Sequence, residues 1–331
     1  MKIQKFNLKR KIFIIAEAGN NHEGNFNRAK KLITLAAKAG ADAIKFQTFK
    51  TENYINRADI KRFKQLKKFE LSYMQFKSLK KLARKKKLKF MSTPLDIKSA
   101  EFLIKNADLI KIASCDNNFF PLIEKVLKSK KPMIISTGMM NISQIKSLTN
   151  FIYKIIGKKL AEKRVSLLHC VTSYPVNDKF ANLKSIEYLI KNSKLTIGYS
   201  DHTMGNEACI AAAAMGAKII EKHITLNKKF SSFRDHALSA DYTDFKNLII
   251  SIRKVEKQLG EFSKEVQKPE KKLIKLVRRS AYVNKDIAKG QKTSLENINF
   301  LRPALTSDFF NLKKILGIKL KKPFFKNKKI N

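Results

Sequence analysis

The feature that most constrains the fold is a regular alternation of short, apolar, β-rich runs with longer segments of helical periodicity. The pattern occurs eight times between residues 11 and 260. Apolar runs that alternate with helices predict parallel strands buried on both faces. The runs are KIFIIAEAG (11–19), ADAIKFQTF (41–49), LKFMSTP (88–94), ADLIKIAS (107–114), KPMIISTG (131–138), RVSLLHC (164–170), LTIGYS (195–200) and AKIIEKHIT (217–225).

Eight β/α units in about 250 residues match the size and period of a TIM (β/α)8 barrel. A doubly wound sheet rarely repeats its unit so evenly, and no glycine-rich dinucleotide fingerprint follows the first run. We therefore predict an α/β chain with a TIM barrel over residues 1–260. Beyond it the alternation stops, which indicates a linker over residues 261–276. Residues 277–331 contain short β-like pieces and a turn at Lys289-Gly290, and predict a small β-rich domain.

The formal net charge of +43 comes mostly from lysine spread along helix-like segments such as KSLKKLARKKKLK. Nucleic-acid binders instead gather lysine and arginine into stripes, often interleaved with aromatic residues. We interpret the charge as solvated helix faces whose field attracts small anions, and we predict no nucleic-acid partner. A polyanion binder is the alternative hypothesis, and it predicts a steep dependence of binding on salt.

The sequence predicts neither a membrane span nor secretion. No stretch is long and apolar enough to cross a bilayer, and the first apolar run breaks at Glu17 without a cleavage site. Cys115, Cys170 and Cys209 are scattered and odd in number, which argues against a disulfide framework. Together these features predict a cytoplasmic protein without a membrane partner.

Polar residues gather at the carboxyl ends of the predicted strands, where TIM barrels carry their chemistry. The set includes Glu221 in the last run. Lys45 and Lys111 could cradle a phosphate and a carboxylate, together with a group of neighbouring hydroxyls. Those hydroxyls belong to Thr93, Ser114, Ser136 and Ser200.

Two adjacent runs end on histidine, and this pair raises the possibility of a metal site. His202 and His223 could ligate one divalent cation and leave positions for water and substrate. A strand-end histidine that hydrogen-bonds a neighbouring carbonyl is the structural alternative. We interpret His22, His169 and His236 as structural or supporting groups.

Carboxylates near the same strand ends have two interpretations. Glu17 is placed to move a proton or to orient water, while Asp116 and Asp235 could hold sugar-like hydroxyls. Alternatively, Glu17 or Asp116 pairs with one of the strand-end lysines.

These residues fall in motifs that occur in order along the chain: FIIAEAGNNHEG, DAIKFQTF, FMSTP, LIKIASCDNNFFPLIEKV, PMIISTGM, LLHCVTSYP, IGYSDHT and IIEKHITL. The chain resembles the N-acetylneuraminate (sialic acid) synthase family, which includes the legionaminic and pseudaminic acid synthases. Its tail, RRSAYVNKDIAKGQ followed by LRP, resembles the antifreeze-like (SAF) domain of that family. Each motif alone is weak, but their order over nearly the whole chain is specific.

The resemblance implies an enzyme that condenses phosphoenolpyruvate with an N-acylated hexosamine, giving a nine-carbon 2-keto sugar acid and phosphate. The C–O bond of phosphoenolpyruvate would break. Its C3 would attack the open-chain aldehyde, water would add at C2, and the tetrahedral intermediate would expel phosphate. A Mn²⁺ or Mg²⁺ ion would polarise the aldehyde and hold the water.

The resemblance also assigns roles by position. His202 and His223 match metal ligands, and Glu17 matches the carboxylate near the reacting carbons. Residues that match groups around phosphoenolpyruvate are Lys45, Thr93, Lys111, Ser114, Ser136 and Ser200, with Thr172 standing where the family often has Asn or Ser. Residues that match sugar contacts are Gln47, Asp116, Tyr174 and Asp235.

Arg302, in the tail motif LRP, matches an arginine that the tail domain lends to the active site of a partner subunit. The resemblance therefore implies a domain-swapped homodimer in which the small domain closes the neighbour's site.

Two departures from the family pattern leave the acceptor sugar open. Asp116 stands where many members carry Glu, and residues 227–241, NKKFSSFRDHALSAD, lack the glycine and proline of some sialic acid synthases. N-acetylmannosamine and a 6-deoxy-diacetamido hexose are both possible acceptors. A Schiff-base aldolase acting through Lys111 or Lys45 on the same barrel is the alternative chemistry.

Overall fold

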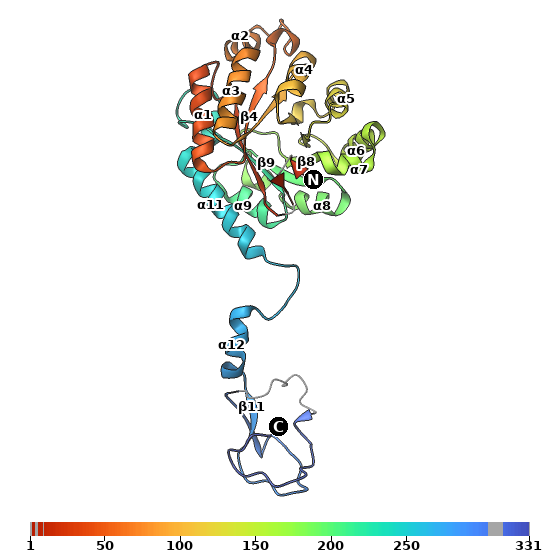
Figure 1. Ribbon diagram of the computed structural model, residues 1–331, viewed down its shortest axis with the longest axis vertical. Helices are drawn as coiled ribbons and strands as arrows, with labels where there is room; N and C mark the ends of the chain where they lie inside the picture. Colours follow the sequence, from red (N-terminus) through yellow and green to blue (C-terminus); the bar gives the residue numbers. More distant parts are fainter. Residues whose placement is uncertain (1, 4–5, 9, 304–313, 331) are drawn as a thin grey trace. The chain divides into compact units, whose positions relative to one another are not determined.

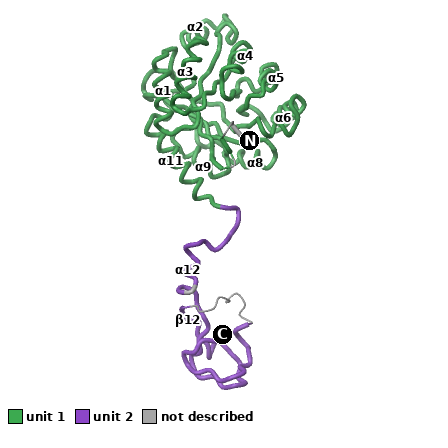
Figure 2. Tube along the Cα trace, viewed as in Figure 1, with its two compact units in different colours: residues 1–260 green, residues 261–331 purple. Residues whose placement is uncertain are grey.

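The computed structural model describes residues 2–3, 6–8, 10–303 and 314–330. The chain divides into two compact units, residues 1–260 and 261–331, which Figure 2 draws in green and purple. The two units are described separately below. Among the described residues, no helix has both the length and the apolar character needed to cross a membrane.

The first unit is a closed barrel of parallel strands, which confirms the predicted TIM barrel (Figure 1). Its strands pair in the order β10-β3-β4-β5-β6-β7-β8-β9. They are β3 (Phe13–Gly19), β4 (Ala43–Thr48), β5 (Lys89–Pro94), β6 (Leu109–Ile112), β7 (Met133–Ser136), β8 (Val165–Cys170), β9 (Thr196–Asp201) and β10 (Ile219–His223). A short antiparallel pair, β1 (Lys2–Ile3) and β2 (Phe6–Asn7), precedes the barrel.

Helices follow the barrel strands and surround them (Figure 1). They are α1 (Phe26–Ala39), α2 (Ile60–Phe69), α3 (Tyr73–Lys85), α4 (Ile97–Asn106), α5 (Phe120–Lys128), α6 (Ile142–Ile156), α7 (Lys158–Arg164), α8 (Lys184–Asn192), α9 (Glu207–Ala214), α10 (Asp235–Leu238) and α11 (Tyr242–Leu259). Three 3-10 turns, η1 (Thr51–Asn53), η2 (Ser114–Asp116) and η3 (Asp178–Phe180), lie in the connections.

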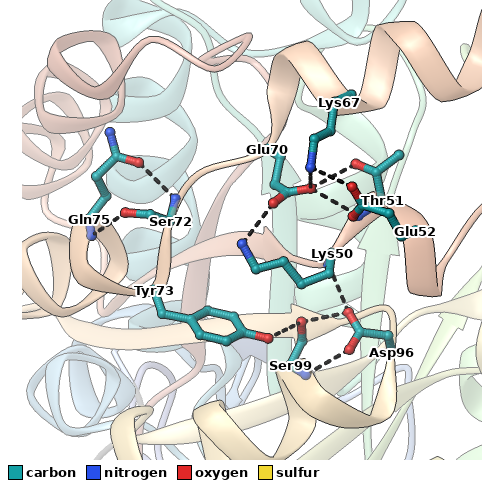
Figure 3. Close-up of polar contacts among 10 residues, drawn as sticks. All are labelled: Lys50, Thr51, Glu52, Lys67, Glu70, Ser72, Tyr73, Gln75, Asp96 and Ser99. Atoms are coloured by element: carbon teal, nitrogen blue, oxygen red, sulfur yellow. Dashed lines mark hydrogen bonds and ion pairs between the residues drawn. The ribbon is translucent and has the colours of Figure 1, made fainter.

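Local sequence signals set where these helices begin and end. The side chain of Asn25 accepts a hydrogen bond from Arg28 N at the start of α1, and Gly40 ends that helix with φ +96°, a left-handed conformation that favours glycine. At α3, Ser72 and Gln75 form a reciprocal capping box, also visible in Figure 3. Caps of this kind fix the length of each connection, and the connections carry residues of the pocket described below.

The strands alternate strictly between two environments, as a period of two requires. Outward side chains such as Ile14, Phe46 and Ile110 pack beneath the helices in the large core. The lower layers of the barrel interior are filled by an apolar cluster: Leu8, Phe13, Ile15, Ala43, Met91, Leu109, Ile134, Leu168 and Ile219. Two residues further along several strands, the inward position becomes polar. The apolar cluster therefore fills one end of the barrel interior, and polar side chains line the other end.

The second unit contains helix α12 (Lys268–Val277) and an antiparallel pair, β11 (Ser280–Val283) and β12 (Ile298–Leu301). Most of α12 falls within residues 261–276, the segment that the sequence predicts as a linker. The small core of the second unit comprises Val283, Ile287 and Leu320. The likeness of this unit to an antifreeze-like domain stays a prediction.

Candidate active site

A pocket of about 190 Å³ lies at the carboxyl ends of the barrel strands, and predicted site residues form much of its lining. These are Glu17, Lys45, Gln47, Thr93, Lys111, Ser114, Ser136, Thr172, Tyr174, Ser200, His202, His223 and Asp235. The pocket is also lined by residues to which the sequence assigned no role, namely Asn20, Tyr54, Arg62, Leu95, Ala113, Cys115, Cys170, Glu221, Phe233 and Arg234.

Strand register explains why the charged residues meet. Glu17 on β3 is paired with Lys45 on β4 on one side and with His223 on β10 on the other. Glu221 on β10 is paired with Ser200 on β9. Partners in a parallel register point to the same face, so these side chains all enter the barrel interior.

The charged side chains form one buried network. Glu221 Oε1 accepts hydrogen bonds from Lys111 Nζ at 2.6 Å and from Ser200 Oγ at 2.9 Å. Lys45 Nζ lies 3.1 Å from the same oxygen and 3.3 Å from Glu17 Oε1. Two lysines thus share two carboxylates in a region where water does not screen them.

The network shifts the pKa values of its two carboxylates, Glu17 and Glu221, in opposite directions. Burial raises the pKa of Glu17 to about 7; the positive charges of Lys45 and Lys111 oppose the rise, and Glu221 adds to it. Burial also acts to raise the pKa of Glu221, but Lys111 and Lys45 hold it well below its usual value. Glu221 is therefore a fixed negative charge, whereas Glu17 can exchange a proton near neutral pH.

Burial, the largest cause, lowers the pKa of Lys111, with Lys45 acting in the same direction against the raising effect of Glu221. The pKa of Lys45 is raised, because its attraction to Glu17 and Glu221 outweighs the opposing effect of burial. With Glu17 protonated, the network carries a net positive charge and suits an anionic ligand.

A group of small polar side chains forms the neighbouring wall. Gly138 N donates to Ser114 Oγ at 3.2 Å, and a Cβ built on Gly138 would lie 2.6 Å from that oxygen and closer still to Thr172 Oγ1. Only glycine allows the backbone to approach both hydroxyls this closely. Ser114, Thr172 and the backbone of Gly138 together form a cradle.

Several buried polar atoms at the pocket have no hydrogen-bond partner within the described part of the chain. They are Glu17 Oε2, Asn20 Oδ1, Thr93 Oγ1, Ser136 Oγ, Thr172 Oγ1, Glu221 Oε2, His223 Nδ1 and Asp235 Oδ1. An unpaired buried polar group costs about 1–3 kcal/mol, so a fold rarely collects several at one place. Their concentration here indicates a site built to bind a polar ligand.

The two strand-end histidines converge as the sequence predicts. Their ring centroids lie 5.4 Å apart. His202 Nδ1 lies 2.8 Å from Val171 O; since a carbonyl can only accept, that nitrogen carries a proton, and in the neutral ring Nε2 holds the lone pair. Burial, with His202 and Lys45, holds the pKa of His223 well below its usual value, which leaves that imidazole neutral.

These features fit a divalent cation bound by two imidazole nitrogens, with other positions left to water and substrate. In the described ranges, no group of three or more His, Cys, Asp and Glu side chains forms a fuller cage. Two protein ligands with open positions suit a catalytic rather than a structural metal.

A second part of the lining comes from the loops beyond the strands. Tyr174 lies with its ring 4.3 Å from the ring of His202, and the Arg234 guanidinium sits 4.5 Å from the centre of the Tyr174 ring. Arg234 Nε is also 3.5 Å from Asp235 Oδ1. Gln47 accepts a hydrogen bond from Asn20 at 2.8 Å. This part of the pocket combines an aromatic ring with hydrogen-bonding side chains, as small-molecule sites commonly do.

Two predicted site residues lie elsewhere. Asp116 ends η2, half-buried, with its carboxylate 3.4 Å from Cys115 Sγ, and it is not part of the pocket lining. Arg302 belongs to the second unit, directly after β12, where it is exposed. The contact of Asp116 with a sugar and the contribution of Arg302 to the active site of a partner subunit stay predictions.

Two central features of the pocket have no role in the prediction from the sequence. Glu221 belongs to the strand-end polar set, and its position two residues before His223 is a signal that places it on the same face. Gly138 has no side chain and gave no signal. Of the remaining histidines, His22 Nδ1 accepts from Gly24 N at 3.0 Å, and burial lowers its pKa to about 3. His169 Nε2 lies 2.9 Å from Ala181 O. Both contacts agree with the structural interpretation.

Comparison with known proteins assigns the family. Residues 32–264 match the NeuB family. The chain belongs to the NeuB family. It is 39% identical to N,N'-diacetyllegionaminic acid synthase of Campylobacter jejuni over 93% of this chain and 95% of that protein. It is 34% identical to pseudaminic acid synthase of the same species over 92% of this chain and 91% of that protein.

A solved structure of the NeuB kind supports both family and fold. The crystal structure of N-acetylneuraminic acid (sialic acid) synthetase from Leptospira borgpetersenii, in complex with citrate, matches with a TM-score of 0.75 and 35% identity. The match covers 80% of this chain and 90% of that chain. This NeuB chain is therefore an enzyme of the sialic acid synthase kind, and the resemblance of its barrel motifs to that family is confirmed.

Proposed function

We propose that this enzyme is a metal-dependent nonulosonate synthase that condenses phosphoenolpyruvate with an N-acylated hexosamine. The observation that carries the proposal is the buried network of Lys45, Lys111, Glu17 and Glu221, set beside hydroxyls that have no hydrogen-bond partner among the described residues. A trianionic, oxygen-rich substrate offers what the lysines and hydroxyls of this environment lack, namely negative charge and hydrogen-bond acceptors.

Phosphoenolpyruvate would bind with its anionic groups on Lys45 and Lys111. The cradle of Ser114, Thr172 and Gly138 would hold one anionic group, and Thr93, Ser136 and Ser200 would complete the hydrogen bonds. Because these groups are already fixed by the strands, they need little rearrangement as charge moves during the reaction.

The reaction would form a C–C bond and a C–O bond to water, and would break the C–O bond to phosphate. C3 of phosphoenolpyruvate attacks the aldehyde carbon of the open-chain sugar, and water adds to the cationic C2. The C2–O bond to phosphate then breaks, leaving the 2-keto group. Glu17, with its pKa raised to about 7, exchanges the proton between the added water and the developing hydroxyl.

His202 and His223 would hold Mn²⁺ or Mg²⁺, which supplies Lewis-acid polarisation of the aldehyde oxygen and a site for water. Tyr174, Gln47 and Asp235 would orient the hydroxyls and the acyl group of the sugar. In a domain-swapped homodimer, Arg302 of the second unit would contribute to the partner subunit's pocket.

The decisive experiment measures phosphate release by the purified full chain with phosphoenolpyruvate, Mn²⁺ and a panel of acceptors. The panel holds N-acetylmannosamine and 6-deoxy-diacetamido hexoses, because relatives named for legionaminic and pseudaminic acids are both similar to this chain. We expect phosphate release that requires both sugar and metal. Absence of sugar-dependent phosphate with every acceptor would overturn the proposal.

A Schiff-base aldolase is the second candidate, and the lowered pKa of Lys111 favours it. It predicts that borohydride with a 2-keto acid traps a covalent adduct on the chain, without any need for metal. Activity that disappears with a chelator and returns with Mn²⁺, without a trapped adduct, excludes this alternative.

A further inference from the structure

A compact polar cluster lies outside the pocket, where the connection after β4 meets the end of α2 and the start of α4 (Figure 3). We call it the Glu70 cluster; its members are Lys50, Thr51, Glu70 and Asp96. None of the four lines the pocket. The mechanism proposed above uses none of them.

The contacts of the Glu70 cluster fix two consecutive residues of the connection. Glu70 Oε2 accepts from Thr51 N and from Thr51 Oγ1, both at 2.9 Å, and Glu70 Oε1 accepts from Lys50 Nζ at 2.7 Å. From the opposite side, Asp96 Oδ2 accepts from Lys50 N at 2.9 Å. Figure 3 shows the two carboxylates on either side of this short stretch.

Asp96 is itself held rigidly, because it caps helix α4. Its Oδ1 accepts from Ser99 N at 2.8 Å and its Oδ2 from Ser99 Oγ at 2.6 Å. Lys50 and Thr51 are therefore tied on one side to the barrel helix α4 and on the other side to Glu70 at the end of α2.

The tied residues lead directly into one wall of the pocket. Turn η1 begins at Thr51, Tyr54 follows it, and α2 then carries Arg62; Tyr54 and Arg62 both line the pocket. The Tyr54 ring lies 5.8 Å from the ring of Phe49. Glu70 is thus placed to set where Tyr54 and Arg62 face the pocket.

The same wall extends to the connection after β10. Phe69, the residue before Glu70, contacts Phe233 edge-to-face at 5.2 Å between ring centroids. Phe233 and Arg234 line the pocket. We define Tyr54, Arg62, Phe233 and Arg234 as the loop wall. Its Arg234 contacts the Tyr174 ring and Asp235, the residues that the proposed function assigns to the sugar.

A carboxylate suits this position better than a neutral group. Thr51 is fully buried, so its N–H and hydroxyl need acceptors, and Glu70 supplies both with one oxygen while its other oxygen meets the Lys50 ammonium. Partial burial acts to raise the pKa of Glu70, but the hydrogen bonds from Lys50 and Thr51 bring it below the usual value. The group therefore stays ionised at working pH.

We propose that Glu70 is a positioning residue for the acceptor sugar, acting through Thr51 and the loop wall without touching the substrate. The proposal rests on the proposed function for the identity of the acceptor. It predicts that weakening the Glu70 cluster disturbs acceptor binding and leaves phosphoenolpyruvate binding intact, because the anion-binding lysines sit on barrel strands.

The first test compares Glu70→Gln with the matched control Glu101→Gln in steady-state kinetics. Glu101 lies on α4, exposed, and pairs with Lys125 at the surface. For Glu70→Gln we expect the KM for the acceptor to rise on the order of tenfold, with the KM for phosphoenolpyruvate changed less than about twofold. Both constants should be unchanged in the control. Equal rises in the two constants, or no rise in either, would overturn the proposal.

The second test is independent of activity and follows amide hydrogen exchange in the full chain without substrates. We expect faster exchange at residues 50–59 in Glu70→Gln, with β3 and β10 unchanged relative to Glu101→Gln. Unchanged exchange at residues 50–59 would overturn the positioning role, whatever the kinetics show. If the unmodified enzyme releases no phosphate with any acceptor, the proposed function has failed, and this exchange result still decides whether Glu70 fixes the loop wall.

Discussion

Strands β9 and β10 carry buried contacts between lysine and carboxylate on both of their faces, and the two faces differ in how completely those groups are satisfied. On the outer face, Lys222 Nζ lies 2.6 Å from Asp201 Oδ2 and donates to Thr203 O at 2.8 Å. Asp201 Oδ1 also accepts from Tyr199 Oη at 3.0 Å and from Thr203 N and Oγ1, both at 2.8 Å.

On the inner face, one register step away, Glu221 and Glu17 each keep an oxygen without a hydrogen-bond partner in the described residues. Both faces are equally buried, so burial alone does not distinguish them. The closed set of partners marks the Asp201–Lys222 pair as structural. The incomplete set of partners around Glu17 and Glu221 marks the inner network as a binding site for a polar ligand.

The largest expected effect comes from breaking the closed pair. Lys222→Met should lower the free energy of unfolding by about 3–5 kcal/mol, because the buried Asp201 carboxylate loses its counter-charge. Urea denaturation measures the change. Lys218→Met, an exposed lysine just before β10, is the matched control and should change stability by less than about 0.5 kcal/mol. Equal stability of the two variants would contradict the structural role of the pair.

A lysine-to-methionine substitution in the inner network should lower activity rather than stability. Lys111→Met should lower kcat/KM by roughly 10²–10³-fold, the scale for losing one fixed electrostatic partner of the reacting groups. The free energy of unfolding should change far less than in Lys222→Met, because Glu221 keeps its contacts with Lys45 and Ser200. Phosphate-release kinetics and urea denaturation on the same preparation test the contrast. A large loss of stability in Lys111→Met would remove the distinction between the two faces.

Much of this site follows from the sequence, since two simple periodicities act together. Alternation within strands places Glu17, Lys45 and Lys111 on one face, and the βα repeat places all strand ends at one mouth. Local pattern is sufficient for these residues because each side chain's direction depends only on its own strand.

The contacts between distant strands could not be predicted in this way. Lys111 on β6 meets Glu221 on β10, its opposite in the strand order of the closed barrel, and only closure brings the two to 2.6 Å. Ser114 and Cys115 of η2 line the pocket, whereas Asp116 at the end of the same turn does not. Tyr54 follows η1 and Arg62 lies on α2, so both are outside the strand-end runs on which the predicted site rests.

The raised pKa of Glu17 should make the free energy of unfolding depend on pH. A carboxyl whose pKa is higher in the folded than in the unfolded state makes the folded chain bind more protons, so stability falls as pH rises from 4.5 through about 7. In metal-free protein the fall attributable to Glu17 should be at most about 3 kcal/mol, at ~1.4 kcal/mol per pKa unit.

The measurement is the free energy of unfolding against pH for the unmodified chain and for Glu17→Gln, with a chelator present. The difference between the two curves should grow across that window, in the direction of a relatively more stable Gln variant at high pH. Parallel curves would show that Glu17 titrates normally.

The smallest expected effect distinguishes the part of the pocket assigned to phosphoenolpyruvate from the part assigned to the sugar. Gly138→Ala places a methyl group against Ser114 Oγ and Thr172 Oγ1, so the cradle must widen although no charged group is altered. We expect the KM for phosphoenolpyruvate to rise about tenfold, corresponding to ~1.4 kcal/mol, with the KM for the acceptor nearly unchanged. Because Thr172 is the nearer obstacle, adding Thr172→Ala should recover part of the loss if crowding is the cause. A rise in the acceptor KM instead would place the cradle at the sugar, reversing the assignment of anion and sugar to the two halves of the pocket.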